Sequence, residues 1–202
     1  MSPLTTSPDH ITRSSAASRS FRPWWRWMLT ALAIPPAGYI GWLLAGHVDS
    51  ASAAALAGVV TGAVFGLGQW LLLRRRGVTL RWVSATAVAL GIGLAVGGAL
   101  VGFETDRVSL FVMGAVSGLA VGVAQARAVR SAMSSVLTWG GTTGALWALG
   151  WVISSFVIDP ADKWPIFGAS GAIVVTLVQS TFIERALPLQ IKPETTTKDV
   201  TS

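Results

Sequence analysis

Residues 58–76 read GVVTGAVFGLGQWLLLRRR, a run in which small residues recur at every fourth position before a glutamine. This phrase occurs three times: as Gly58, Gly62, Gly66 and Gln69; as Gly114, Gly118, Gly122 and Gln125; and, with two glycines replaced, as Gly168, Ala172, Thr176 and Gln179. The copies start 56 and then 54 residues apart. A near-constant period of this kind indicates three versions of one structural unit.

A second repeated feature lies ahead of each phrase. Three tryptophans each stand eleven residues before a glycine: Trp27 before Gly38, Trp82 before Gly93 and Trp139 before Gly150. We therefore expect each unit to be a helical hairpin. Its outgoing helix opens with the tryptophan and its returning helix ends with the glutamine, which gives units 27–76, 82–130 and 139–185.

The composition indicates that lipid is the solvent of these helices. Of 202 residues, 52% are hydrophobic and 12% are charged, and a helix needs about 20 apolar residues to cross a hydrocarbon core about 30 Å thick. Six stretches of about this length contain no ionisable side chain other than that of Tyr39: 27–46, 51–73, 82–103, 108–126, 136–158 and 164–183.

The fold class that follows is an all-α polytopic membrane protein with six transmembrane helices in three tandem two-helix repeats. Each repeat contains an even number of crossings, so the three can be related only by a pseudo-threefold axis along the membrane normal. Pro35 and Pro36 are expected to bend the first helix alone. Residues 21–187 form the predicted membrane domain, and the polar segments 1–20 and 188–202 are predicted to be disordered cytoplasmic tails.

The net charge of +6 reflects membrane topology. Thirteen of the 15 basic residues fall on one side of the predicted spans: Arg13, Arg19, Arg22, Arg26, Arg74, Arg75, Arg76, Arg81, Arg127, Arg130, Arg185, Lys192 and Lys198. The positive-inside rule therefore places both termini in the cytoplasm. Nucleic acid is not an expected partner, because the short loops offer no organised basic face.

Tryptophans mark the expected boundaries of the spans. Trp70, Trp82 and Trp139 stand at predicted cytoplasmic ends, where amphipathic indole rings are expected at the level of the lipid headgroups. Trp27 is expected to do the same, and Trp147 alone falls in the middle of a span.

The repeated small residues share one face of each returning helix. Positions i, i+4, i+8 and i+11 fall within about 80° of one another at 100° per residue. Helices in membranes associate where small residues let backbones approach closely. The stripes are therefore predicted to pack helices together: Gly58, Gly62, Gly66, Gly114, Gly118, Gly122, Gly168, Ala172 and Thr176.

The three glutamines allow two interpretations. Gln69, Gln125 and Gln179 each stand five residues before a charged residue, about 7 Å inside the predicted cytoplasmic boundary. Each amide needs hydrogen-bond partners at that depth, so each either bonds to a neighbouring helix and fixes the packing, or joins the other two as a polar ring around a solute path.

Catalytic and metal-binding chemistry are not expected. The spans contain no Asp, Glu, Lys, Arg or His that could serve as a base or proton relay, and the chain has no cysteine. The one group of residues that could hold a metal lies in the predicted outer loops: His47, Asp49, Glu104, Asp106, Asp159 and Asp162. A lone histidine at a helix end is usually interfacial, so we predict that this group binds no metal. Because the spans also lack catalytic groups, we predict no enzyme activity and no cofactor.

The run from Gly62 through Gln69 and Trp70 into Arg74 and Arg75 resembles a group of uncharacterised multipass bacterial membrane proteins built from a repeated GxxxGxxQ(W) two-helix unit. The resemblance covers all three units and is weakest in the third, where Ala172 and Thr176 replace glycines. It implies this fold and a place in a bacterial inner membrane, and it implies no activity.

Two functions are consistent with these features. The first is a non-enzymatic scaffold or accessory subunit, which would have a packed centre and would meet lipid, a second membrane protein or another copy of the chain. The alternative is a passive facilitator or carrier for a small neutral or lipid-like solute, which would have a central cavity reached by the glutamines. The sequence favours the scaffold, because no residue pattern selects a substrate.

Overall fold

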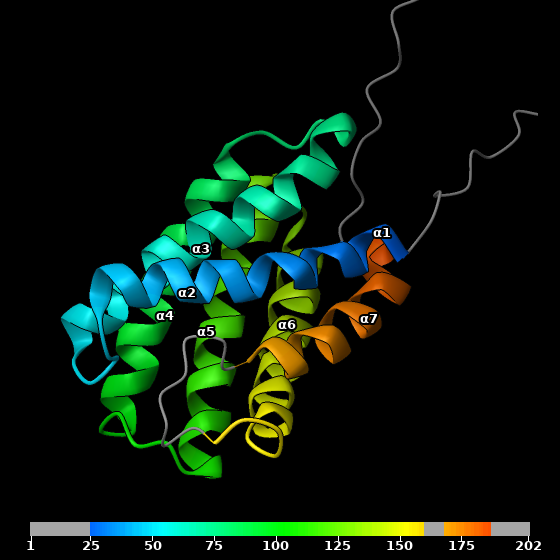
Figure 1. Ribbon diagram of the computed structural model, residues 1–202. Coiled ribbons are helices and arrows are strands. Elements are labelled where there is room, and N and C mark those ends of the chain that lie inside the picture. Colours follow the sequence, from blue (N-terminus) through cyan, green and yellow to red (C-terminus); the bar gives the residue numbers. More distant parts are fainter. Residues whose placement is uncertain (1–24, 160–167, 187–202) are drawn as a thin grey trace, which may run out of the picture.

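The computed structural model describes residues 25–159 and 168–186, and all regular secondary structure in these two ranges is helical (Figure 1). The prediction of an all-α protein is confirmed. The tails predicted at 1–20 and 188–202 lie outside the described residues, as do Asp162 and residues 21–24 and 187 of the predicted membrane domain.

The described chain is a succession of helical segments joined by short connections. The helices are α1 (Trp25–Met28), η1 (Leu29–Ala33), α2 (Ile34–Ala45), α3 (Ala51–Leu73), η2 (Arg74–Arg76), α4 (Arg81–Leu100), α5 (Arg107–Ala128), α6 (Met133–Ser154) and α7 (Ala169–Ala186). The bounds of α3 are those predicted. The helix predicted at 136–158 begins one turn earlier, at Met133, and ends at Ser154.

Local sequence explains where several helices begin. The Ser50 hydroxyl accepts a hydrogen bond from the Ala53 amide at the start of α3, and Asp106 accepts from the first amides of α5. Pro35 and Pro36 stand in the first turn of α2, where a missing amide costs least. The first membrane segment is therefore divided into α1, a 3-10 turn and α2.

Four of the described helical segments are long and apolar enough to cross a membrane: Arg26–Ala45, Ala51–Arg76, Arg81–Leu100 and Arg107–Ala128. Large aliphatic side chains cover the outside of the bundle, with Leu32, Leu137 and Val108 about 70% exposed. An apolar periphery of this kind is typical of a membrane protein. α6 contains 22 residues, the length of a span, but is not among these four segments.

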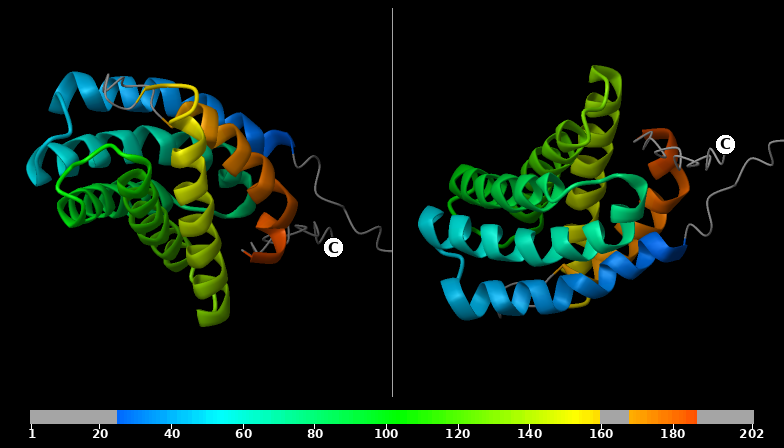
Figure 2. Two further views of the ribbon diagram at one scale, coloured as in Figure 1. Left: turned by 90° about the horizontal axis from the view of Figure 1, so that it is seen from below. Right: turned by 90° about the horizontal axis from the view of Figure 1, so that it is seen from above.

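The helices form a ring in the order of the chain. From α2 to α7 each long helix packs against its neighbours in sequence, and α7 closes the ring by packing against α1, η1 and α2. Figure 1 shows α7 meeting α1 and then diverging from α2, and the two views of Figure 2 show the same closure between the first and last helices. Within the described residues, helices on opposite sides of the ring make no backbone contact.

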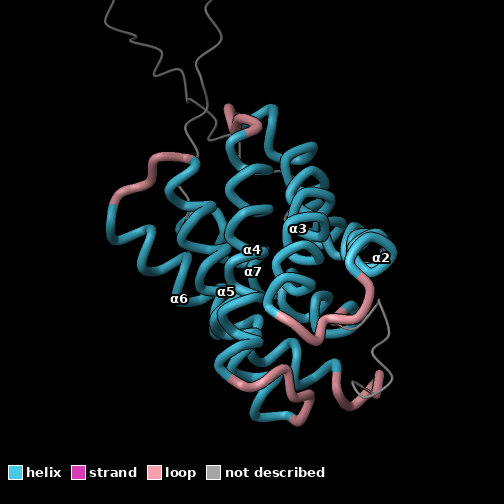
Figure 3. Tube along the Cα trace, turned by 90° about the vertical axis from the view of Figure 1, so that its left-hand side faces the viewer, coloured by secondary structure: helices cyan, strands magenta, loops and turns pink. Residues whose placement is uncertain are grey.

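The loops gather at the two ends of the bundle (Figure 3). We call one end the tryptophan end, because it carries Trp27, Trp82 and Trp139. The other is the acidic end, which carries Asp49, Glu104 and Asp106. The described chain both begins and ends at the tryptophan end, where α1 contacts α7.

Candidate functional site

The glycine stripe of α3 lies against the backbone of α4. A Cβ atom placed on Gly58 would lie 2.7 Å from the Cα of Gly91, and one on Gly62 would lie 2.8 Å from the Cα of Ala87. Real Cβ atoms do not approach backbone so closely, so only glycine fits at these two positions. Gly66 is in a less crowded position, because a Cβ placed on it would lie 3.0 Å from the Cβ of Thr86.

The stripe of α5 has the same relation to α6. A Cβ on Gly114 would lie 2.8 Å from the carbonyl oxygen of Trp147, and one on Gly118 would lie 2.7 Å from that of Thr143. A Cβ placed on Gly122 would lie 2.9 Å from the Cα of Gly140. In both helix pairs the small residues therefore stand where backbones approach most closely.

Two of the three glutamines are bonded directly to each other. The Gln125 Nε2 atom donates to Gln69 Oε1 over 2.8 Å and to the Thr86 hydroxyl over 3.1 Å. The indole Nε1 of Trp82 donates to Gln69 over 3.0 Å, and that of Trp139 donates to Gln125 over 3.2 Å. All of these side chains are buried.

Gln179 takes part in a parallel but looser set of bonds. Its Oε1 accepts from the indole of Trp27 over 3.4 Å, and its Nε2 donates to the Thr143 hydroxyl over 3.3 Å. Each of the three repeated tryptophans thus donates to the glutamine of the neighbouring hairpin. The bond from Trp27 in α1 to Gln179 in α7 completes a ring of three such tryptophan–glutamine bonds.

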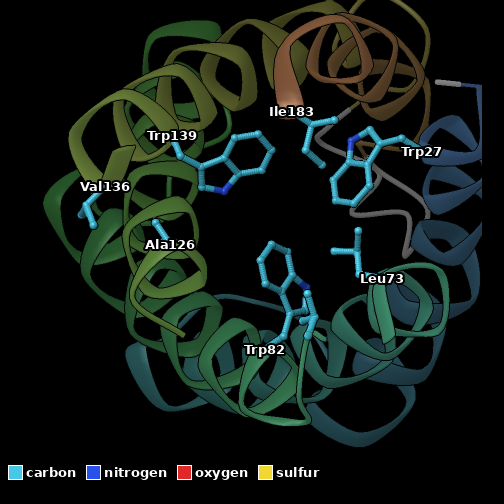
Figure 4. Close-up of a cluster of buried hydrophobic side chains, with 8 residues drawn as sticks. Trp27, Leu73, Trp82, Ala126, Val136, Trp139 and Ile183 are labelled. Carbon is cyan, nitrogen blue, oxygen red and sulfur yellow. The ribbon is translucent and has the colours of Figure 1, made fainter. Parts of the chain in front are cut away.

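The three tryptophans fill the middle of the tryptophan end. They belong to one buried cluster with Leu73, Ala126, Val136 and Ile183 (Figure 4). The rings of Trp27 and Trp139 meet edge to face with their centroids 6.3 Å apart, a favoured geometry for aromatic pairs. Trp82 and Trp139 are fully buried and Trp27 is 3% exposed, so this end of the bundle is closed.

The burial of these rings corrects one sequence prediction. Trp27, Trp82 and Trp139 were expected at the level of the lipid headgroups, but they lie inside the bundle. The reason is that each indole N–H has a buried glutamine to bond. In the sequence, the equal spacing of these three tryptophans from a following glycine was the feature that could have indicated a shared role inside the bundle. Trp70 follows the expectation more closely, because its half-buried ring donates to Val78 near the end of the bundle.

A cavity of about 260 Å³ occupies the centre of the other half of the bundle. It extends from loop residues of the acidic end, including His47 and Thr105, to Gln179, and every helix from α2 to α7 contributes to its lining. Its walls are largely apolar, with Phe65, Leu90 and Met113 among them. Gln69 and Gln125 do not reach it in the described structure.

The third stripe lines this cavity. Gly168, Ala172, Thr176 and Gln179 all face it, whereas no member of the first two stripes does so among the lining residues of the described chain. The three copies of the phrase therefore stand in two different environments. Trp147, the tryptophan predicted in the middle of a span, also faces the cavity.

The charged residues that the structure describes at the acidic end do not assemble into a metal site. Among the described residues, no three His, Asp or Glu side chains lie close enough together to hold an ion. Asp106 caps α5, and its hydrogen bonds from the Ser109 hydroxyl and from the amides of Ser109 and Val108 lower the pKa of its carboxyl below the usual 3.8. This carboxylate therefore has a structural role at the start of α5.

Comparison with known proteins finds no matching family, no similar curated protein and no similar solved structure.

Proposed function

We propose that this chain is a non-enzymatic multipass membrane protein that binds an apolar small molecule in its central cavity. The observation that carries the proposal is the cavity itself, which is about 260 Å³ in volume and lined by every helix from α2 to α7. An apolar cavity of about 150 Å³ is large enough to bind benzene. A void of this size between apolar walls leaves their packing contacts unmade, and a ligand would restore them.

The proposed topology has six spans in three two-helix units, related by a pseudo-threefold axis along the membrane normal. The repeated bonds from Trp82 to Gln69, from Trp139 to Gln125 and from Trp27 to Gln179 support it. The positive-inside rule makes the tryptophan end cytoplasmic, so the cavity faces the outside. The resemblance of the repeated phrase favours a bacterial inner membrane.

The sequence favoured a scaffold, and that function requires a packed centre. The buried cluster around Trp82 and Trp139 meets this requirement at the tryptophan end. The other half of the bundle is hollow, which supports the alternative of a carrier for a neutral or lipid-like solute. We therefore prefer ligand binding to a purely structural role.

Binding can be tested by fluorescence quenching in detergent-solubilised protein. Trp42, Trp147 and Trp151 line the cavity, so 1-bromooctane, whose bromine quenches indoles on contact, should produce a saturable loss of emission. Val175→Phe should abolish the saturable component by filling the cavity. Val174→Phe is the matched control, because Val174 is 39% exposed on the outer surface while Val175 is buried and faces the cavity. Quenching that never saturates, or that both variants reduce equally, would rule out the cavity as a binding site.

A further inference from the structure

The third stripe differs from the other two in the face that it turns to the bundle. In α3 and α5 the stripe glycines take part in the closest helix approach. In α7 that contact belongs to Gly171, whose Cβ position is occupied by the carbonyl of Gly150. Gly171 precedes stripe residue Ala172 by one position, which is about 100° of rotation on a helix.

This offset places the stripe of α7 on the cavity. Ala172 and Thr176, which stand where the other copies have glycine, both face the cavity and are buried. The loss of glycine in the third copy thus coincides with a change from helix packing to cavity lining.

Polar groups gather at the deep end of the cavity. Gln179 holds its two partners by the longest bonds of the glutamine network, 3.4 and 3.3 Å. An amide has two N–H donors and two acceptor positions, so an N–H and a lone pair remain beyond the bonds made in the described structure. The Thr176 hydroxyl donates to the Ala172 carbonyl over 2.8 Å, which leaves its oxygen available as an acceptor.

The lining residues also limit the charge of a ligand. Among the described residues that face the cavity, His47 at the acidic end is the one with an ionisable side chain. The deep end has none. A charged group placed beside Gln179 would lose its hydration without gaining a counter-ion, at a large cost in free energy. An uncharged donor or acceptor group would find partners there.

From these observations we infer that the third stripe is the specificity-determining face of the site, and that the ligand is an uncharged apolar molecule carrying one hydroxyl group. That hydroxyl accepts from the free N–H of the Gln179 amide and donates to the Thr176 oxygen, and the apolar remainder extends towards the acidic end between Leu90 and Met113. This inference rests on the proposed function.

The test compares three brominated probes on the same protein: 1-bromooctane, 8-bromo-1-octanol and 8-bromooctanoate at pH 7. Gln179→Met and Thr176→Val keep side-chain volume while removing polar atoms. We expect each to weaken binding of 8-bromo-1-octanol about fivefold to tenfold, the effect of one lost hydrogen bond, and to leave the affinity for 1-bromooctane unchanged. Thr181→Val is the matched control, since Thr181 is exposed on the same helix, and it should alter neither affinity.

The outcomes separate the two proposals. If no probe quenches the wild type in a saturable way, the proposed function itself fails. If 1-bromooctane binds but both variants weaken it as much as they weaken the alcohol, or weaken neither probe, the cavity binds ligands and the assignment of the polar group is wrong. Binding of the carboxylate as tight as that of the alcohol would overturn the requirement for an uncharged ligand. Thr176→Val provides the answer alone if Gln179→Met does not fold.

Discussion

The side chain of Gln125 donates a 2.8 Å hydrogen bond to Gln69, and this bond joins α5 to α3, whose backbones make no contact in the described part of the chain. Gln125 also donates to Thr86 on α4 and accepts from Trp139 on α6. One side chain therefore connects three other helices at the closed end of the bundle.

Replacing Gln125 should cost more stability than replacing Gln179. Gln125→Leu removes three bonds between helices, and at about 0.6 kcal/mol each in a membrane protein the loss is about 2 kcal/mol. Gln179→Leu removes two longer bonds and should cost about 1 kcal/mol. Equilibrium unfolding in mixed detergent micelles measures both, with Thr181→Val as the neutral control. Equal costs would show that the two networks have the same strength.

Substitution by alanine should have opposite effects on stability at Gly58, which faces a neighbouring helix, and at Gly141, which is exposed. Gly58→Ala forces a Cβ against the backbone of Gly91 and should destabilise the protein by about 1–3 kcal/mol. Gly141 has no atom within 4 Å of its Cβ position. Gly141→Ala should therefore be neutral or stabilising by up to about 1 kcal/mol, because alanine has the better helix propensity. Thermal unfolding followed by circular dichroism distinguishes the two, and a destabilised Gly141→Ala would contradict its open surroundings.

Removing a buried hydroxyl should increase stability at one site. Ser117 is fully buried on α5, and its Oγ atom has no hydrogen-bond partner among the described residues. Ser117→Ala removes this unsatisfied group and should stabilise the protein by about 1 kcal/mol. The melting temperature of the variant is the measurement. A marked decrease would mean that the hydroxyl is bonded in the membrane-embedded protein.

The cap of α5 should make stability depend on acid pH. The pKa of Asp106 is lowered in the folded protein by the Ser109 hydroxyl and by backbone amides, so its contribution is complete above pH 3.8 and is lost as the pH falls through the lowered pKa. Asp106→Ala should reduce the melting temperature at pH 7. The difference from wild type should shrink below pH 3.8 and disappear once the carboxyl is protonated in the folded state. A difference that persists in acid would assign the effect to packing.

The sequence predicts the helices well because apolar runs and their boundaries are local features. The bounds of α3 agree with the uncharged run, and Ser50 and Asp106 supply caps where α3 and α5 begin. The stripe positions also predict which face of α3 meets another helix, but the partner, α4, is known only from the structure.

The site itself depends on relations between helices that no local pattern contains. The tryptophans were expected at the membrane surface because an indole N–H usually finds a partner there, and the buried partners lie on other hairpins. The contact of α7 with α6 is made at Gly171, one residue before the stripe position Ala172. The cavity depends on where six helix faces meet, and its existence could not be predicted from any one of them.

The closed tryptophan end has a consequence for the ligand that we propose. The cavity ends at Gln179, and beyond it the buried rings of Trp27, Trp82 and Trp139 leave no ionisable group in the described interior of that end. In this conformation the described cavity therefore does not extend through the tryptophan end of the bundle. The binding that we propose would thus use a compartment with one closed end, which a ligand enters and leaves without a path across the whole bundle.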